Sequence, residues 1–390
     1  MNRYERYLSL SAEIIDRYNG TEPFSVFIKK YFALNKKLGS RDRKQISDCC
    51  YAYFRSGHLL EKIEMPARVA ASLFLCKQTD AQILEYLYPE WHNQLQAGIE
   101  EKCAVLGITW VPSMVFPWID HLSSSINPDA FIKNHFIQPD LFLRIRRGEK
   151  ERVITKIKEA NIPYRILSED AIVLPNSTKI EDLLSLNREV VVQDFSSQQI
   201  AHLFKYLPHQ NNYQFKTWDI CAASGGKSIL LKDYFPNTIL TVSDKRDTIL
   251  RNLKSRFIEA GISYESAYIV DLTKELPPNF KKKNFDLIMA DVPCTGSGTW
   301  SRTPEWLRYF DLQQMMTYAD LQYEIIQTVL PSLKKDGYLL YATCSVFKEE
   351  NEEQVAKISQ YFGLRIVASE LFKGYEHKAD TMYGALMQKI

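Results

Sequence analysis

The sequence lacks the features that mark membrane-spanning, secreted or fibrous proteins. None of its apolar runs approaches the roughly 20 residues that a membrane-spanning helix requires. The charged residues Arg3 and Glu5 stand where a secretion signal would begin its apolar stretch. With 45% hydrophobic and 25% charged residues, the composition is globular rather than disordered, collagen-like or coiled-coil. We therefore expect a globular protein of the cytoplasm that does not bind membranes.

Paired cysteines are also missing. The seven cysteines are odd in number, and none belongs to a CxxC pair. This scatter argues against a disulfide framework and against a zinc site, and it favours reduced thiols in a reducing compartment. No metal is therefore expected. The seven are Cys49, Cys50, Cys76, Cys103, Cys221, Cys294 and Cys344.

A strong charge of either sign is absent as well. The 49 basic and 47 acidic residues leave a net charge of +2, whereas many nucleic-acid-binding proteins are far more basic. Evidence for a nucleic-acid partner must therefore come from motifs. The length of 390 residues predicts two to three domains.

The N-terminal third predicts an all-α domain over residues 1–128. Up to about residue 106 the chain has helical periodicity and few glycines. A helix start at residues 40–43 is followed by apolar residues at i, i+3, i+4 and i+7, which form one buried stripe. Prolines and serines between residues 109 and 128 indicate a connector. The stripe consists of Ile46, Cys49, Cys50 and Tyr53.

A small α+β domain is expected over residues 129–194. Its elements have the order βαββαβ, the split βαβ arrangement of many small RNA-binding sheets. The aromatic strand signature of the common RNA-recognition module is absent, so a spacer between two larger domains is the alternative. The strands are expected at 141–146, 164–167, 171–174 and 190–193, and the helices at 149–160 and 181–184.

Basic residues gather at the start of this small domain. Two interpretations stay open: the side chains contact RNA phosphates, or they form a solvated charged face. The residues are Arg144, Arg146, Arg147, Lys150 and Arg152.

Residues 195–390 alternate strands and helices, which predicts a Rossmann-like α/β domain with a parallel, doubly wound sheet of seven strands. Ligands bind at the carboxyl ends of the strands in this architecture, so the residues after each strand are the candidates for chemistry. Amphipathic helices are expected at 245–260, 312–333 and 349–362. The strands are expected at 214–220, 238–243, 267–270, 285–291, 337–343, 364–368 and 384–390.

A turn of small residues, from Cys221 to Ser228, follows the first of these strands. Such residues let the backbone approach a ligand at the start of a helix. A P-loop requires glycine where Cys221 stands, and the turn does not fit GxGxxG, so both phosphate-binding loops are disfavoured. The next two strands end in Asp244 and Asp271, and their carboxylates suit ribose hydroxyls and an adenine amino group. Helix capping is the alternative role for either aspartate alone.

Two cysteines follow the fourth and fifth strands. Cys294 comes three residues after Asp291, and Cys344 lies between a threonine and a serine. A lone cysteine at a strand end is usually a small buried hydrophobic residue. Two of them at neighbouring strand ends, one beside an aspartate, indicate a reactive pair.

These segments together resemble the Sun-domain family of RNA cytosine-5 methyltransferases, which use S-adenosyl-L-methionine. The family's CAAPGGK loop matches Cys221–Lys227, with Ser224 in place of the usual proline. Its DAPC motif matches Asp291–Cys294, and its TCS motif matches Thr343–Ser345. The matches extend over roughly residues 140–390. Further matches are Gln193-Asp194, Ser197-Gln198, Arg302–Glu305 and Glu350–Glu352.

The N-terminal region resembles the NusB-type helical domain that RsmB-like enzymes carry ahead of the methyltransferase. Residues 42–44 and 51–55 follow its DR…YG.LR pattern, with Ala52-Tyr53 where the pattern has its glycine. The resemblance implies a domain that assists RNA binding. It also implies that the RNA partner is small-subunit ribosomal RNA and that the protein acts in rRNA processing. We expect the protein to be a monomer.

The family's chemistry explains why these residue types recur. Carbon 5 of cytosine is too weak a nucleophile to attack a methyl sulfonium, and a thiolate that adds to carbon 6 activates it. By resemblance Cys344 is this nucleophile, and Cys294 assists release of the 5-methylcytosine product. Asp291 is expected to hydrogen-bond the base, and Lys227 to hold Asp291 or lower a thiol pKa. The cofactor is expected to contact Cys221, Ala222, Ala223, Ser224, Gly225, Gly226, Lys227, Asp244, Asp271 and Asp291.

Two other interpretations stay open. DNA cytosine-5 methyltransferases use the cysteine of a Pro-Cys motif, which would make Cys294 the nucleophile. Alternatively, the protein is a catalytically degenerate, RNA-binding ribosome-assembly factor. The two thiols and the three cofactor-facing acids, all present, weigh against the second interpretation.

Overall fold

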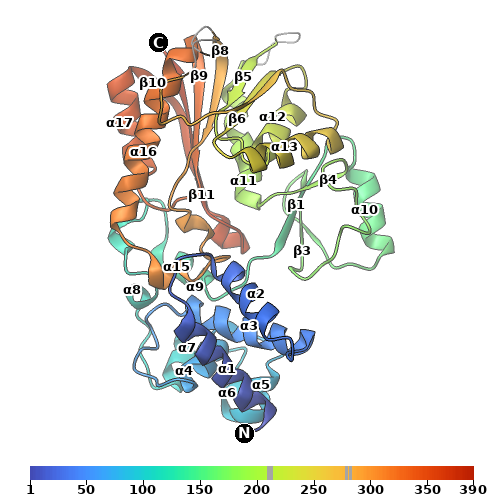
Figure 1. Ribbon diagram of the computed structural model, residues 1–390, viewed down its shortest axis with the longest axis vertical. Coiled ribbons are helices and arrows are strands. Elements are labelled where there is room, and N and C mark those ends of the chain that lie inside the picture. Colours follow the sequence, from blue (N-terminus) through green and yellow to red (C-terminus); the bar gives the residue numbers. More distant parts are fainter. Residues whose placement is uncertain (209–213, 277–279, 281–282) are drawn as a thin grey trace. The chain divides into compact units, whose positions relative to one another are not determined.

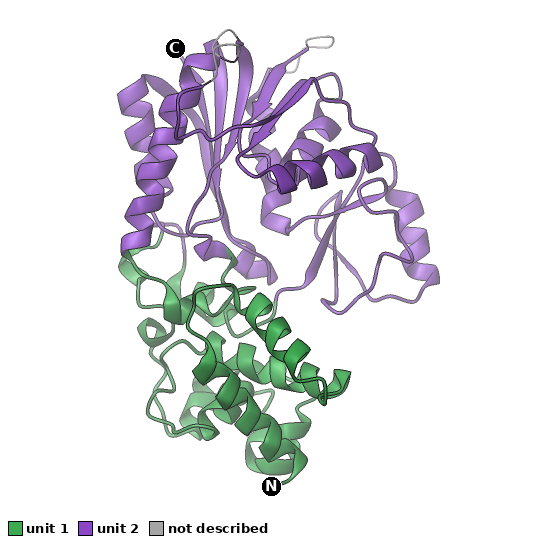
Figure 2. Ribbon diagram, in the orientation of Figure 1, with its two compact units in different colours: residues 1–122, 127–138, 299–312 green, residues 123–126, 139–298, 313–390 purple. Residues whose placement is uncertain are grey.

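The computed structural model describes residues 1–208, 214–276, 280 and 283–390. These residues divide into two compact units, which Figure 2 colours green and purple. No helix in the described part of the chain is long and apolar enough to span a membrane. Unit 1 comprises Met1–Leu122, Asn127–Gln138 and Thr299–Leu312, and unit 2 comprises Ser123–Ile126, Pro139–Gly298 and Gln313–Ile390.

The named secondary-structure elements of unit 1 are all helices among its described residues, as the sequence predicts for residues 1–128, whereas Thr299–Leu312 was expected in the α/β domain. The apolar stripe expected on α3 is buried, and it packs against α1 and α4 in one core. Asn2 begins α1 with a capping box, in which its side chain accepts from the Glu5 N–H and the Glu5 carboxylate accepts from the Asn2 N–H. The helices are α1 (Arg3–Arg17), α2 (Phe24–Leu34), α3 (Ser40–Arg55), α4 (Ala67–Cys76), α5 (Gln82–Leu87), α6 (Pro89–His92), α7 (Ile99–Val105), α8 (Pro112–Val115), η1 (Ile119–His121), α9 (Pro128–Asn134) and α15 (Trp306–Tyr309).

A four-stranded antiparallel sheet in unit 2 confirms the predicted small α+β region. Its strand order is β2-β3-β1-β4. The helix expected at residues 181–184 is wrong, because these residues form turns. The segment is too short to nucleate a helix, and the chain reverses at Asn187, whose φ is +63°. The elements are β1 (Leu141–Ile145), α10 (Lys150–Glu159), β2 (Arg165–Ile166), β3 (Ala171–Leu174) and β4 (Val190–Val192).

The seven-stranded sheet has the order β10-β11-β9-β8-β5-β6-β7. All seven strands were expected, but the prediction that all are parallel is wrong, because β11 runs antiparallel to both β9 and β10. Only the short segment around η5 separates β10 from β11, so no crossover helix reverses the chain there. The strands are β5 (Lys216–Asp219), β6 (Ile239–Asp244), β7 (Ser266–Ile269), β8 (Phe285–Asp291), β9 (Leu333–Thr343), β10 (Leu364–Phe372) and β11 (Met382–Lys389).

Helices cover both faces of this sheet, as expected for a doubly wound fold (Figure 1). Trp218, Ile288 and Tyr341 face α16 and α17 in one core, whereas Leu287 and Leu340 on the same strands face α12 and η2 in another. This alternation follows from the two-residue period of the strands. The helices are α11 (Phe195–Gln199), η2 (Ile200–Tyr206), α12 (Gly226–Tyr234), α13 (Asp247–Glu259), η3 (Ser297–Thr299), α16 (Gln313–Val329), η4 (Leu330–Ser332), α17 (Glu352–Phe362) and η5 (Gly374–His377).

The basic residues at the start of the small sheet are largely used inside the protein. Arg144 is 3% exposed and forms an ion pair with Asp233. Arg146 binds the same aspartate at 2.8 Å, and Arg152 binds the buried Glu189 at 2.9 Å. The two ion pairs with Asp233 join the small sheet to α12, the pair of Arg152 with Glu189 stays within the small α+β region, and only part of the set is left to contact RNA.

Candidate active site

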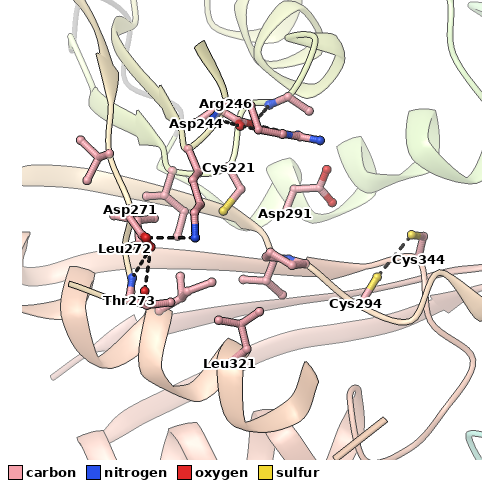
Figure 3. A pocket seen from close by; sticks show the side chains of 17 residues that line it. Cys221, Asp244, Arg246, Asp271, Leu272, Thr273, Asp291, Cys294, Leu321 and Cys344 are labelled. Atoms are coloured by element: carbon pink, nitrogen blue, oxygen red, sulfur yellow. Dashed lines mark hydrogen bonds and ion pairs between the residues drawn. The ribbon is translucent and has the colours of Figure 1, made fainter. Parts of the chain in front are cut away.

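The carboxyl ends of strands β5 to β9 meet at a cavity of about 400 Å³ (Figure 3). Its lining combines apolar side chains with aspartates and thiols, and it includes most of the residues singled out in the sequence. Those residues are Cys221, Ala223, Asp244, Asp271, Asp291, Cys294 and Cys344. The arrangement is the one expected for a ligand site at the strand ends of an open α/β sheet.

The two thiols are in contact at one end of this cavity. Cys294 follows β8 and Cys344 follows β9, and these strands pair in parallel. The two Sγ atoms lie 3.3 Å apart, and both residues are free cysteines. A hydrogen bond with Cys344, burial and the nearby Glu350 carboxylate hold the pKa of the Cys294 thiol well above its usual value. The Cys294 thiol is therefore the harder of the two to ionise by these interactions, and either sulfur can donate in the contact between them.

An ion pair lies beside the thiols. Lys227, from the first turn of α12, places its Nζ 2.7 Å from Oδ2 of Asp291 at the end of β8. Burial alone would lower the pKa of Lys227, but the charge and hydrogen bond of Asp291 outweigh it and raise this pKa. The Lys227 ammonium also interacts electrostatically with Cys344. A positive charge and a carboxylate thus stand next to the pair of sulfurs.

Asp244 lies at the other end of the cavity (Figure 3). Its Oδ2 accepts from the Ala223 N–H at 3.1 Å, which ties the aspartate to the small-residue turn. Arg246 binds both carboxylate oxygens through its Nε and Nη2, at 3.0 and 3.1 Å. Burial raises the pKa of Asp244, but the hydrogen bonds and charge of Arg246 dominate and lower it. The carboxylate therefore stays ionised and able to accept further hydrogen bonds.

Asp271 follows β7 on the same side of the cavity. Its side chain accepts from the N–H and hydroxyl of Thr273, and it forms an ion pair with Lys245 at 2.9 Å. These hydrogen bonds lower the pKa of Asp271 to about 2. The bonds to Thr273 stabilise a local turn. Asp271 therefore has a local structural role and also lines the cavity.

The turn between β5 and α12 separates this cavity from a second one of about 240 Å³. Gly225, whose φ is +83°, packs so closely that an added Cβ would lie 2.6 Å from the Phe257 ring, and it lines neither cavity. Ser224, in the position of the family's proline, accepts from the Arg256 Nη1 through its hydroxyl at 2.7 Å. The turn residues that line the second cavity are Cys221, Ala222, Ala223, Ser224, Gly226 and Lys227.

Asp219 is a site residue that the sequence analysis missed. It ends β5, lines the second cavity and is 1% exposed. Its Oδ2 accepts from the Ser228 hydroxyl at 2.6 Å, whereas its Oδ1 has no hydrogen-bond partner among the described residues. Burial raises the pKa of Asp219 to about 7. The sequence analysis extended this strand to residue 220, whereas the structure ends it at Asp219, just as Asp244 and Asp291 end their strands.

The large cavity fits S-adenosylmethionine by the chemistry of its walls. Val270, Leu272 and Ile325 offer an apolar surface for a purine, and Asp244 and Asp271 offer acceptors for hydroxyl and amino groups. Among the described residues, no group of three or more His, Cys, Asp or Glu side chains is placed to hold a metal ion. The cavity thus has an apolar wall, ionised acceptors and a thiol pair.

Comparison with known sequences identifies related proteins. The model of the family "16S rRNA methyltransferase RsmB/F" matches residues 178–380. Ribosomal RNA small subunit methyltransferase B of Yersinia enterocolitica is 31% identical over 236 residues, which are 57% of this chain and 52% of that protein. A probable enzyme of the same name from Bacillus subtilis is 27% identical over 226 residues, which are 57% of this chain and 49% of that protein. The matched segment thus spans about half the length of these relatives.

Solved structures show the same fold. The crystal structure of PH0851 superposes with a TM-score of 0.71 over 100% of both chains, at 17% identity. A methyltransferase homolog protein from Pyrococcus horikoshii has a TM-score of 0.59 at 17% identity, over 75% of this chain and 98% of that one. At these identities the similarity concerns the fold alone.

Proposed function

Because the chain belongs to the RsmB/F family of 16S rRNA methyltransferases, we propose that it methylates carbon 5 of a cytosine in small-subunit ribosomal RNA. The observation that carries the proposal is the contact of Cys294 with Cys344 beside the ion pair of Lys227 and Asp291. The relatives' names, which refer to small-subunit ribosomal RNA, support this substrate.

The proposed cofactor is S-adenosylmethionine, which supplies an electrophilic methyl group when bound. Asp244 would accept from its ribose hydroxyls, and Asp271 would face its adenine. The turn from Cys221 to Lys227 would contact the methionine end, where small side chains leave the backbone accessible.

Cys344 is the proposed nucleophile. Its thiolate adds to carbon 6 of the cytosine, so an S–C6 bond forms and electron density moves to carbon 5. The Lys227 ammonium interacts electrostatically with the Cys344 sulfur, which a positive charge would favour as the site of negative charge. The Glu350 carboxylate, by contrast, disfavours negative charge on Cys294. The charges around the pair thus support Cys344 over Cys294 as the attacking sulfur.

Asp291 and Cys294 are assigned the remaining steps. Asp291, held by Lys227, would hydrogen-bond the cytosine at N3 or the amino group and stabilise the charge that develops on addition. After carbon 5 carries the methyl group, its proton leaves, the S–C6 bond breaks and the double bond between carbons 5 and 6 forms again. Cys294, in contact with the departing Cys344 sulfur, assists this release.

RNA binding is assigned to the parts outside the methyltransferase domain. We propose an all-α NusB-like domain at 1–128, a small α+β domain at 129–194 and the catalytic domain at 195–390. Because the thiols lie in a cavity, the target base must leave its stack to reach them. Ribosomal RNA as substrate places the action in the cytoplasm. That the enzyme acts as a monomer stays a prediction, which sedimentation with and without RNA tests.

A methyl-transfer assay tests the proposed function. The purified chain is incubated with methyl-labelled S-adenosylmethionine and small-subunit RNA from cells that lack the protein, and bisulfite sequencing then maps any 5-methylcytosine. We expect one or a few modified cytosines in this RNA and none in DNA of the same sequence. Methylation of the DNA alone would instead support the DNA-type enzyme. RNA binding without methyl transfer would support the assembly factor.

A further inference from the structure

A buried carboxylate, Glu350, is hydrogen-bonded to the residues that follow the two cysteines. It stands between β9 and α17 and is 0% exposed. Four hydrogen bonds converge on its side chain. The sequence analysis recorded this residue only as part of a motif and assigned it no role.

The hydrogen bonds of Glu350 reach both cysteine-bearing loops. Its Oε1 accepts from the Thr295 N–H at 2.9 Å, and its Oε2 accepts from the Thr295 hydroxyl at 2.6 Å. The same Oε2 accepts from the hydroxyl of Ser345. Thr295 directly follows Cys294, and Ser345 directly follows Cys344. One carboxylate therefore ties together the two residues that neighbour the thiols.

Neighbouring buried groups fix Glu350 itself. Gln322, on α16, donates from its Nε2 to Glu350 Oε1 at 2.9 Å. The Tyr341 hydroxyl donates to Gln322 Oε1 at 2.8 Å and to the Glu350 backbone carbonyl at 2.7 Å. Asn351 accepts from the Thr343 hydroxyl at 2.5 Å and donates to the Ser345 carbonyl at 3.0 Å. The residues before and after Cys344 are thus both held from the same segment.

We propose that Glu350 is a positioning residue that keeps the sulfurs of Cys294 and Cys344 in contact, an inference that builds on the function proposed above. Taking a carboxylate out of water is costly unless several donors satisfy it, and here four donors do so. A structural role alone would need no link between both thiol loops. The link is what places Cys294 where it can assist release of Cys344.

The length of the side chain and its charge make separable predictions. Glu350→Asp keeps the charge but shortens the side chain by one methylene, so it cannot reach both Thr295 and Ser345. Glu350→Gln keeps the length. Its Oε1 can accept from the Thr295 N–H and from Gln322, and its amide can donate to the two hydroxyls, which then turn to accept. The proposal therefore expects Asp, the charge-conserving change, to be the damaging one.

Disulfide formation measures the contact without RNA or cofactor. Diamide takes up the two hydrogens of a thiol pair while an S–S bond forms, and mass spectrometry of the digest quantifies the Cys294–Cys344 link. The rate depends on how often the sulfurs come into bonding geometry, and a displacement of about 1 Å reduces such rates by about a hundredfold. We expect Glu350→Asp to slow the link at least about tenfold and Glu350→Gln to slow it less than about threefold.

A matched control is available three residues further along the chain, in the helix that follows. Glu353, in the first turn of α17, is exposed and has no side-chain contact with either thiol loop among the described residues. Glu353→Ala removes one negative charge close to the site and should leave the rate of disulfide formation unchanged. Circular dichroism and thermal unfolding confirm that each variant is folded before its rate is compared.

Methylation then reports how the contact is used. In Glu350→Asp we expect kcat to fall while the KM for RNA stays unchanged, and in Glu350→Gln we expect most of kcat to return. Equal rates of disulfide formation in wild type and Glu350→Asp, or an equal loss in the Asp and Gln variants, would overturn the proposal. An enzyme that links its thiols as expected but transfers no methyl group would contradict the proposed function and leave the positioning role standing.

Discussion

The thiol end of the large cavity is held by buried hydrogen bonds, whereas both aspartates at the other end also form ion pairs with solvent-exposed side chains. Glu350 is 0% exposed, with four donors fixed around it. The side chains that bind Asp244 and Asp271 are 60% exposed in Arg246 and 70% exposed in Lys245. Buried bonds in a low-dielectric interior resist rearrangement, but exposed ion pairs contribute little and exchange readily.

This difference suggests a division of labour within one cavity. The sulfurs must meet a base in one geometry, so their surroundings are fixed in advance. The carboxylates must receive a ligand, so their present partners are ones that can release them. Substitutions at the two ends should therefore differ in size and in the kinetic constant that they change.

The largest effect is expected at the thiol end. Cys344→Ser replaces the proposed nucleophile by a hydroxyl that is far less acidic, and methyl transfer should fall at least about a thousandfold. The dissociation constant of S-adenosylmethionine, measured by calorimetry, should stay unchanged. Substantial methyl transfer by Cys344→Ser would show that chemistry does not depend on the Cys344 thiol.

The carboxylate end should respond in binding rather than in chemistry. Asp244→Ala removes an ionised hydrogen-bond acceptor, so the dissociation constant of the cofactor should rise about tenfold or more. Arg246→Ala removes only an exposed partner of that aspartate and should change the constant by less than about threefold. If the cofactor dissociation constant rose equally in the two variants, cofactor binding would depend on the Arg246 ion pair as much as on Asp244 itself.

Asp219 allows the fixed interior to be tested by pH. Its pKa is raised from a usual value of 3.8 to about 7 in the folded protein, so the folded state holds a proton that the unfolded state has lost. The contribution of Asp219 to stability should therefore decrease as pH rises from about 4 to about 7. Asp219→Asn removes this dependence. The free energy of unfolding of the wild type should fall across this pH range, and that of Asp219→Asn should not. Urea titration should therefore show the difference, variant minus wild type, increasing by about 1 kcal/mol or more from about pH 4 to about pH 7.

The smallest effect is expected at Ser224. Its hydrogen bond with Arg256 is exposed, so Ser224→Pro, which restores the residue usual in the family, should change cofactor affinity by less than about threefold. Ser224→Ala serves as the control, because it removes the hydroxyl without imposing proline geometry. A tenfold or larger loss in either variant would show that the turn is held more tightly than its exposure suggests.

The sequence predicted which residues come together at this cavity because they follow strands. The regular succession of strands and helices located β8 at Phe285–Asp291, and the candidate reactive residues come directly after such strands. Parallel neighbours then bring Cys294 and Cys344 together without further information. Asp219 was missed because the strand was expected to continue to residue 220, which placed Asp219 inside the strand rather than at its end.

Features that depend on distant partners were not predictable in this way. The direction of β11 depends on which strands it pairs with. Side chains alternate between the two faces of a sheet in parallel and antiparallel strands alike, so the local sequence does not give the direction. The buried ion pair of Arg144 with Asp233 joins residues 89 apart in sequence, so a basic cluster was visible but its internal use was not. The role proposed for Glu350 likewise depends on Thr295, 55 residues away.

Trapping of the covalent RNA adduct tests the central claim most directly. Cys294→Ala and Cys344→Ala proteins are incubated with methyl-labelled S-adenosylmethionine and target RNA and then separated by denaturing electrophoresis. If Cys344 attacks carbon 6 and Cys294 acts only in release, the Cys294→Ala protein accumulates a protein–RNA complex that contains the transferred methyl group, and Cys344→Ala forms none. A complex in Cys344→Ala and none in Cys294→Ala would contradict this account and make Cys294 the nucleophile.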